Sequence, residues 1–402
     1  LVDRGLVKLE EKVRTYVPEL KMKDEHAAAN VTVLQLLNHT AGWPGDVFES
    51  FGDGDDALER FVSSMINLDQ AIPLGSGFSY NNASLNVAGH VIAKVTGKTY
   101  EKAMQELIYS PLGLTDTCFF PVDVITRRFA VGHKQDPDGT IRIARPWALS
   151  RSGAPAGGFG VSATTADQIA WARFHMGDGT ARDGTRVLSK ELLDLMKEPT
   201  FLIPGSALGD AVGISWFIED VAGTQTVSHG GDVIGQHSSF VMVPDRRFAV
   251  TVLTNCDDIG SKLKGDAVDW ILEAYLGVVA PQPEPVKLPD DALAQYVGRY
   301  ETHHAIADVT ANDGALILQV ELKKEAVKEL FAEEEEIPDQ PPFPMGILDG
   351  DGDRYVITDG PAKGMKGYFG RNESGEIASV HVGGRLAIKS GPIPATISST
   401  SA

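Results

Sequence analysis

The sequence predicts an α/β (α+β) protein in two parts: a larger domain with an antiparallel sheet flanked by helices, followed by a smaller all-β domain. Helical and strand patterns are mixed before residue 279, whereas short β-prone runs bounded by Gly, Asp and Asn follow residue 289. Between them, residues 279–289 contain four prolines and are typical of an extended linker. We therefore expect domains at 1–278 and 290–392, with a tail at 393–402.

Two successive helices are expected in the first third of the chain. The first has apolar residues at helical spacing, and Gly97 stands where a helix C-terminus favours a left-handed residue. Asn82 is expected as the N-cap of this helix. The second helix is expected to begin at Thr99 and to stop at Pro111. Tyr80 would then lie in the loop just before the first helix.

An antiparallel hairpin is expected near the end of the larger domain. Residues 238–243 and 248–253 are apolar and β-prone, and the Pro-Asp-Arg-Arg stretch between them is typical of a turn. Residues 227–231 look like the end of a strand that leads into this hairpin. The amphipathic pattern of residues 266–275 predicts a closing helix.

The smaller domain contains further strand and loop signals. Residues 315–320 and 354–357 are expected as strands. The acidic run at 349–353 resembles the start of a calcium loop but lacks the Gly and Glu that such a loop requires, so a β-turn is expected. Residues 333–336 are expected to form a solvated, charged loop.

The composition is that of a folded globular protein. The 402 residues are 43% hydrophobic and 23% charged, which is enough apolar material for two cores. A formal net charge of −19 opposes binding to nucleic acid or to an anionic membrane surface. No apolar run is long enough to span a bilayer. Cys118 and Cys256 have no metal-site spacing, and we expect neither a metal nor another cofactor.

A series of short blocks points to one enzyme group. They are Leu-Leu-Asn-His-Thr-Ala-Gly at 36–42, Pro-Leu-Gly-Ser-Gly-Phe-Ser-Tyr-Asn-Asn at 73–82, Pro-Leu-Gly-Leu at 111–114, Pro-Ala-Gly-Gly at 155–158, Ser-His-Gly-Gly at 228–231 and Leu-Thr-Asn at 253–255. In this order they resemble segments of the serine β-lactamase-related group, which includes class C β-lactamases, D-alanyl-D-alanine peptidases and family VIII esterases. The resemblance implies a β-lactamase/penicillin-binding-protein-like fold for the larger domain.

The resemblance also implies a site built around Tyr80, Asn82 and His229. In this group a Ser-x-x-Lys motif supplies the nucleophile and its partner cation, and the tyrosine of Tyr-x-Asn shares the work of taking the serine proton. Tyr80 would fill that second role, and Asn82 would hydrogen-bond the lysine and the acyl side chain of the substrate. His229 stands where β-lactamases place the lysine of Lys-Thr-Gly, which weakens the case for a dedicated β-lactamase.

Residues on either side of these three have expected roles as well. Gly230 and Gly231 would leave no side chain between the strand and the substrate, and the backbone N–H of Asp232 is expected as one oxyanion-hole donor. The other donor would be the N–H of the nucleophile itself. His39 is expected to be structural, because loop histidines that hydrogen-bond the backbone are commoner than catalytic ones.

The nucleophile motif is not in the place that the resemblance implies. One Ser-x-x-Lys occurs, at Ser261 to Lys264, but it follows His229 instead of preceding Tyr80. We interpret it as a helix start that Ser261 caps. The nucleophile is expected upstream of Leu1, and the chain as given is expected to be unstable or inactive.

Two hypotheses about function stay open at this point. In the first, the parent protein is a serine hydrolase that transfers an acyl group to water through an acyl-serine, on a small-molecule ester, an amide, a β-lactam or a D-amino-acid peptide. In the second, the chain is a non-catalytic relative that binds a ligand or partner. The presence of Tyr80, Asn82 and His229 together favours the first, because a site without catalysis has no chemical need of them.

The smaller domain carries a shorter resemblance. Tyr-Val-Gly-Arg-Tyr at 296–300 is similar to the opening of lipocalin-like β-domains that follow many hydrolases of this group. Membership of the group implies a periplasmic or secreted bacterial protein, although the residues given contain no signal region. The sequence does not determine the oligomeric state.

Overall fold

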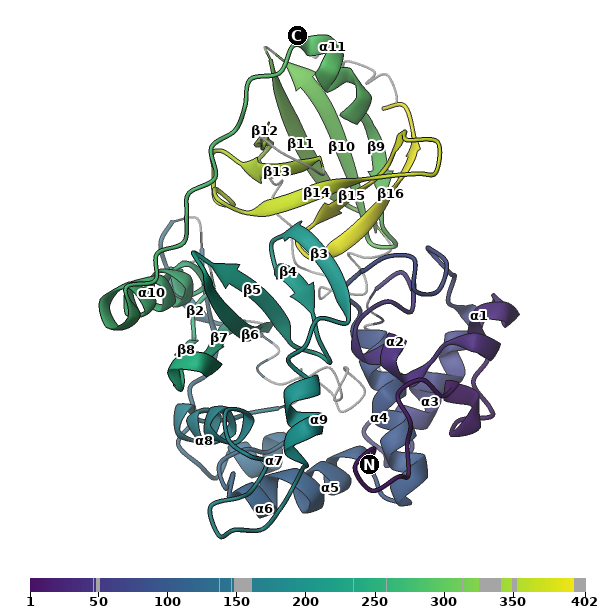
Figure 1. Ribbon diagram of the computed structural model, residues 1–402, viewed down its shortest axis with the longest axis vertical. Helices are drawn as coiled ribbons and strands as arrows, with labels where there is room; N and C mark the ends of the chain where they lie inside the picture. Colours follow the sequence, from purple (N-terminus) through teal and green to yellow (C-terminus); the bar gives the residue numbers. More distant parts are fainter. Residues whose placement is uncertain are drawn as a thin grey trace. The chain divides into compact units, whose positions relative to one another are not determined.

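The structure is a computed structural model, and it describes residues 1–393 except 46, 48–50, 137, 146, 148–160, 234, 258, 313, 325–340 and 349–352. The chain forms two compact units (Figure 1). The first consists of Leu1–Ile203 and Gly209–Pro281, and the second of Pro204–Leu208 and the residues from Gln282 onward. The Pro-Ala-Gly-Gly block at 155–158, the charged run at 333–336 and most of the turn at 349–353 lie outside the described residues.

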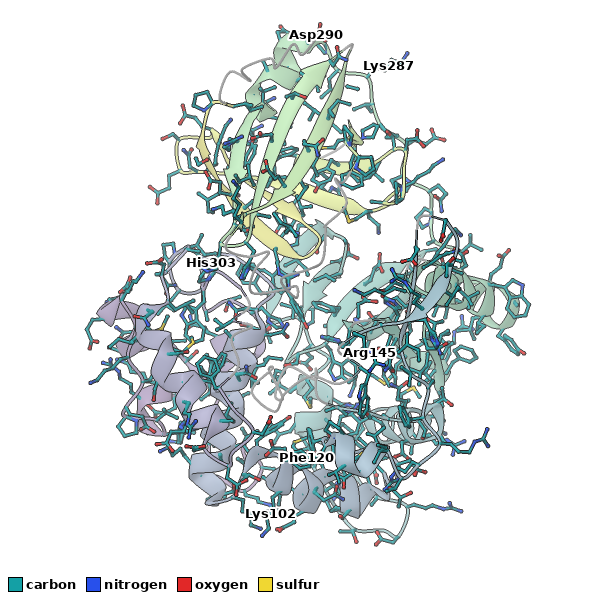
Figure 2. All side chains as sticks on the ribbon, turned by 180° about the vertical axis from the view of Figure 1, so that it is seen from behind. Lys102, Phe120, Arg145, Lys287, Asp290 and His303 are labelled. Carbon is teal, nitrogen blue, oxygen red and sulfur yellow. The ribbon has the colours of Figure 1, made fainter. Side chains whose placement is uncertain are left out.

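Short helices make up the first half of the first unit, as Figure 1 shows. They are α1 (Glu25–Asn30), α2 (Val33–Leu37), α3 (Ala57–Ser64), α4 (Asn82–Thr96), α5 (Tyr100–Met104), α6 (Ser110–Leu112), α7 (Pro121–Val124), α8 (Thr165–His175) and α9 (Lys190–Leu195). Apolar side chains from α2, α3 and α4 pack around Trp43 to form a buried core. Lys102 of α5 and Phe120, which precedes α7, are labelled in Figure 2.

The two predicted helices are present, with corrections at their ends. Helix α4 is capped by Asn81, not by Asn82: Asn81 still has extended backbone angles, and its side chain accepts the N–H of Ser84. Gly97 ends the helix with φ 66°, as expected. The next helix does begin after Thr99, but it continues past Pro111 through a π-helical turn (Gln105–Tyr109) and α6.

An antiparallel sheet follows along the chain, with strand order β3-β4-β5-β6-β7-β8. The strands are β3 (Phe201–Ser206), β4 (Gly209–Val212), β5 (Phe217–Val221), β6 (Thr224–Val233), β7 (Gln236–Val243) and β8 (Phe248–Thr254). The predicted hairpin is β7–β8, closed by the pair Val243 and Phe248. The closing helix α10 (Ile259–Leu276) is longer than expected, and its Val268 and Leu272 pack with Val243. A small hairpin, β1 (His133–Gln135) and β2 (Ile141–Ile143), forms a separate two-stranded sheet, and His133 is bridged to Cys256 just after β8.

The second unit is a closed antiparallel barrel of eight strands, which confirms the predicted all-β domain. The strands are β9 (Gly298–Glu301), β10 (Ala305–Asn312), β11 (Ala315–Leu322), β12 (Phe343–Ile347), β13 (Arg354–Ile357), β14 (Lys366–Arg371), β15 (Ile377–Val382) and β16 (Arg385–Gly391). Helix α11 (Asp290–Leu293) leads into it, and Asp290 is labelled in Figure 2. Tyr300 is fully buried, and its hydroxyl donates to the carbonyl of Tyr296 (2.6 Å).

None of the helices in the described part of the chain combines the length and the apolar character that a bilayer span requires.

A buried histidine lies in an aromatic cluster between the helices and the sheet of the first unit. The ring of His175, at the end of α8, is 4.3 Å from that of Trp171 and 5.1 Å from that of Trp216, measured between centroids. His175 is 1% exposed, and neither ring nitrogen has a hydrogen-bond partner among the described residues. Burial lowers the pKa of this imidazole from 6.5 to about 3.

Protonation of His175 therefore disfavours the folded state. Between pH 6.5 and about 3 the unfolded chain binds a proton that the folded chain does not, so the free energy of unfolding falls as the pH falls through this range. We expect His175→Phe to remove this part of the pH dependence of the free energy of unfolding. The part amounts to up to about 1.4 kcal/mol per pH unit. Denaturant unfolding at pH 4, 5, 6 and 8 measures it. A difference between variant and wild type that stays constant over these pH values would contradict the prediction.

Candidate active site

Tyr80 lies in the loop that leads into α4, and this loop is held by the segment around residue 40. The backbone N–H of Asn81 donates to Nδ1 of His39 (3.1 Å), and Asn81 Nδ2 donates to the carbonyl of Trp43 (3.1 Å). The N–H of Ser79 donates to the carbonyl of His39 (3.1 Å). Because His39 is buried and bonds the backbone, it has the structural role expected for it.

The fold brings Tyr80 and His229 together from distant parts of the sequence. The two rings are 6.1 Å apart between centroids, and the ring of His39 is 4.5 Å from Tyr80 on another side. Phe217, at the start of β5, stacks on His229 at 5.1 Å with an interplanar angle of 24°. Asn82, the first residue of α4, is 3% exposed, so its amide is buried near this cluster at the start of the helix.

The pairing of β6 with β5 ends where the site begins. Ala222 and Gly223 form the turn between these strands with φ of 51° and 82°, which is the pattern of a type I′ turn closed by a hydrogen-bonded pair. In an antiparallel pair, every second residue directs its N–H and C=O toward the same neighbouring strand. Counted from the pair that closes the turn, Ser228 is one of the residues whose N–H and C=O point toward β5. Beyond Ser228 no pairing with β5 is recorded among the described residues, whereas pairing with β7 continues to Val233.

The same alternation gives β6 an open edge at the site. Gly230 and Asp232 follow Ser228 by two and by four residues. Their N–H and C=O groups therefore point to the same side of β6 as those of Ser228, which is this edge. Donation by His229 Nδ1 to the carbonyl of Gly230 (2.6 Å) agrees with that direction. The N–H of Asp232 therefore lies on this edge of β6, where it forms no recorded strand pairing within the described part of the chain.

The glycines beside His229 also have neighbours on β7 that favour them. A Cβ atom at Gly230 would come within 3.1 Å of the carbonyl oxygen of Ser238, and one at Gly231 within 3.1 Å of its Oγ. A larger residue would have to push β7 away. These two positions thus favour glycine through strand packing, in addition to the open path to the substrate that the sequence predicts.

His229 is neutral in this environment. Burial lowers the pKa of its imidazole, and the hydrogen bond to the Gly230 carbonyl opposes this only in part. Because a carbonyl can only accept, Nδ1 carries the proton, and Nε2 of the neutral ring keeps its lone pair. The residue therefore offers a hydrogen-bond acceptor where a lysine would offer a cation.

The Ser-x-x-Lys pair lies in α10. The helix begins at Ile259, so Ser261 is inside its first turn and does not cap it. The ammonium of Lys264 is in an ion pair with the carboxylate of Asp232. This pair and the stacking of Phe217 on His229 escaped the sequence analysis, because both depend on strand register and helix placement rather than on a local motif.

Comparisons with known proteins identify the family and the fold. A family model described as Beta-lactamase matches residues 1–273. Penicillin-binding protein 4 of Amycolatopsis lactamdurans is 31% identical over 307 residues, which cover 75% of this chain and 80% of that protein. The crystal structure of SurE gives a TM-score of 0.70 at 23% identity and covers 96% of this chain and 83% of its own. D-amino acid amidase from Ochrobactrum anthropi SV3, complexed with L-phenylalanine amide, gives 0.54 at 27% identity and covers 68% and 78%. The predicted fold class is confirmed.

The neutral state of His229 is open to direct measurement. We expect its imidazole to titrate in NMR spectra with a midpoint below 6.5, because burial against Phe217 disfavours the charged ring. Phe217→Ala should admit water and raise the midpoint toward 6.5. Phe119→Ala is the control, because that ring packs on Tyr100 and Tyr109 instead. A wild-type midpoint at or above 6.5 would contradict the assignment.

Proposed function

Because the chain belongs to the Beta-lactamase family of serine hydrolases, we propose that it serves acyl transfer to water through an acyl-serine, with Tyr80, Asn82 and His229 as its contribution to the site. The observation that carries this proposal is the meeting of Tyr80 and His229 beside the open edge of β6. A packing role alone would not require a phenol, a neutral imidazole and an outward-directed N–H at one place.

The proposed chemistry divides the work among these groups. The serine oxygen attacks the carbonyl carbon of the substrate, its proton passes to the Tyr80 oxygen, and the phenol's own proton moves to the lone pair of His229 Nε2. The carbonyl oxygen gains negative charge, and the N–H of Asp232 stabilises it. His229 returns its proton through Tyr80 to the leaving alcohol or amine as the bond of that group to the carbonyl carbon breaks. Water then attacks the acyl-serine and gives a proton to the same relay, which returns it to the serine oxygen as the acid is released.

The pair at Ser261 and Lys264 is not the nucleophile motif of this proposal. The family's chemistry needs a serine with a lysine beside it at the site, whereas the side chain of Lys264 is in an ion pair with Asp232. Asn82 would hold the lysine of that motif and the substrate.

The proposed substrates are esters and amides, including amides and peptides of D-amino acids. A neutral His229 cannot form the ion pair that a lysine would make with the carboxylate of a β-lactam, so β-lactams are the weaker candidate. The likeness to D-amino acid amidase, at 27% identity, supports amides of D-amino acids as the first compounds to test.

A second candidate is a ligand- or partner-binding protein without catalysis. It is favoured by one observation: within residues 1–402, Ser-x-x-Lys occurs at Ser261 to Lys264 and nowhere ahead of Tyr80. The two candidates differ in whether a covalent intermediate forms.

A burst experiment separates them. Residues 1–402 alone are expected to give no burst of nitrophenol from p-nitrophenyl acetate, because the nucleophile and one oxyanion donor are missing. The product of the complete coding sequence is expected to give a burst equal to the enzyme concentration, measured by stopped-flow absorbance. A burst from residues 1–402 would place the nucleophile within them, and none from the complete protein would favour the binding protein.

Removing the Tyr80 hydroxyl tests its role in proton transfer. In the complete protein, Tyr80→Phe is expected to lower kcat by about 10²–10⁴-fold, the usual contribution of general acid–base catalysis. The ring and its contacts remain, so the melting temperature should change little. Tyr275→Phe is the matched control, since that side chain is 70% exposed on α10. Wild-type kcat in Tyr80→Phe would leave Tyr80 with a packing role only.

A further inference from the structure

Asp232 belongs to a group of four connected titratable side chains, with His237, Asp257 and Lys264. Asp232 and His237 are direct partners across β6 and β7, and His237 Nδ1 lies 2.5 Å from Asp232 Oδ1. His237 Nε2 lies 3.0 Å from Oδ1 of Asp257, in the loop between β8 and α10. Lys264 of α10 donates to the same oxygen of Asp232. The group joins two strands, a loop and a helix on the face of the sheet that α10 covers.

The contacts within this group are closely connected. Both carboxylates accept other donors as well: Asp232 accepts from Lys264, and Asp257 accepts the backbone N–H of Gly235 (2.9 Å). The side chains of His237 and Lys264 are 9% and 13% exposed, so both are largely buried at these contacts. Loss of the Asp232 carboxylate would leave the ammonium of Lys264 buried without its partner, which is costly.

This group lies beside the part of β6 that has a paired strand on one side within the described residues. From His229 to Val233, β6 is paired with β7 alone among the described residues. The turn that follows is held at Gly235, where an added Cβ would come within 2.5 Å of the backbone nitrogen of His133. Between this turn and the end of β5 pairing, the carboxylate of Asp232 is the side chain that ties the strand to α10.

We propose that Lys264 and His237 are positioning residues that hold Asp232, and with it the backbone N–H that serves as oxyanion donor, at the open edge of β6. This inference rests on the proposed function. It also assigns a role to the Ser-x-x-Lys pair of α10: its lysine supports the oxyanion hole from behind the strand instead of activating a nucleophile.

A double-mutant cycle on the product of the complete coding sequence tests the role. Lys264→Met and Asp232→Asn are each expected to lower kcat for an activated ester by about 10- to 100-fold, the scale of a small misplacement of a catalytic group. KM should change much less, because an oxyanion donor acts mainly in the transition state. The double variant should lose no more than either single variant, because both substitutions break one contact.

Three further variants sharpen the test. Lys264→Arg should restore most of the kcat, since it keeps a cation within reach of Asp232. His237→Gln should resemble Lys264→Met, because an amide does not reach both Asp232 and Asp257 as the two ring nitrogens of His237 do. Lys262→Met is the control: it removes the exposed ion pair with Asp266 from the same helix and should leave kcat unchanged.

The outcomes separate the two proposals. Wild-type kcat in Lys264→Met, or losses of Lys264→Met and Asp232→Asn that multiply in the double variant, would overturn the positioning role and leave the proposed function standing. A fall in melting temperature without a fall in kcat would overturn it equally. Absence of turnover in the wild-type protein would overturn the proposed function, and this role with it.

Discussion

The candidate site depends on which residues of β6 direct their backbone N–H and C=O groups toward β5 and which toward β7. The turn at Ala222 and Gly223 sets which residues of the strand face β5, and every second residue afterwards keeps that direction. Because β5 pairing ends at Ser228, the groups of Gly230 and Asp232 that would have bonded β5 are left at an open edge. A shift of one residue would turn them toward β7 and remove the donor from the site.

The loop that carries Tyr80 is fixed by an equally local constraint. His39 accepts the N–H of Asn81, and Asn81 in turn caps α4, so the residues on both sides of this pair are placed by one short chain of hydrogen bonds. The ring of Tyr80 is 4.5 Å from that of His39 and 6.1 Å from that of His229, measured between centroids. The backbone that carries the phenol is therefore placed by the same hydrogen bonds that begin the helix.

Local patterns in the sequence were enough to predict part of this fold. The β7–β8 hairpin and β13 were predicted because apolar runs and turn residues alternate there, and the end of α4 was predicted because Gly97 allows a left-handed conformation. The cap of α4 was misplaced by one residue, since two adjacent asparagines are equally good caps in sequence. The proximity of Tyr80 and His229 was predicted from the family resemblance alone. The stacking of Phe217 and the charges around Asp232 depend on register, which no local pattern expresses.

Two histidines on neighbouring strands show how the two faces of the sheet differ. His229 of β6 stacks on an aromatic ring, and burial lowers the pKa of its imidazole, although the hydrogen bond to a backbone carbonyl opposes this shift in part. His237 of β7 lies between the carboxylates of Asp232 and Asp257, which also accept other donors. Because side chains alternate between the faces of a strand, His229 and the partner pair Asp232 and His237 lie on opposite faces. His237 is thus on the face that α10 covers, where its contacts join structural elements, and His229 is beside Tyr80. The same type of side chain has different contacts because the strand separates the two environments.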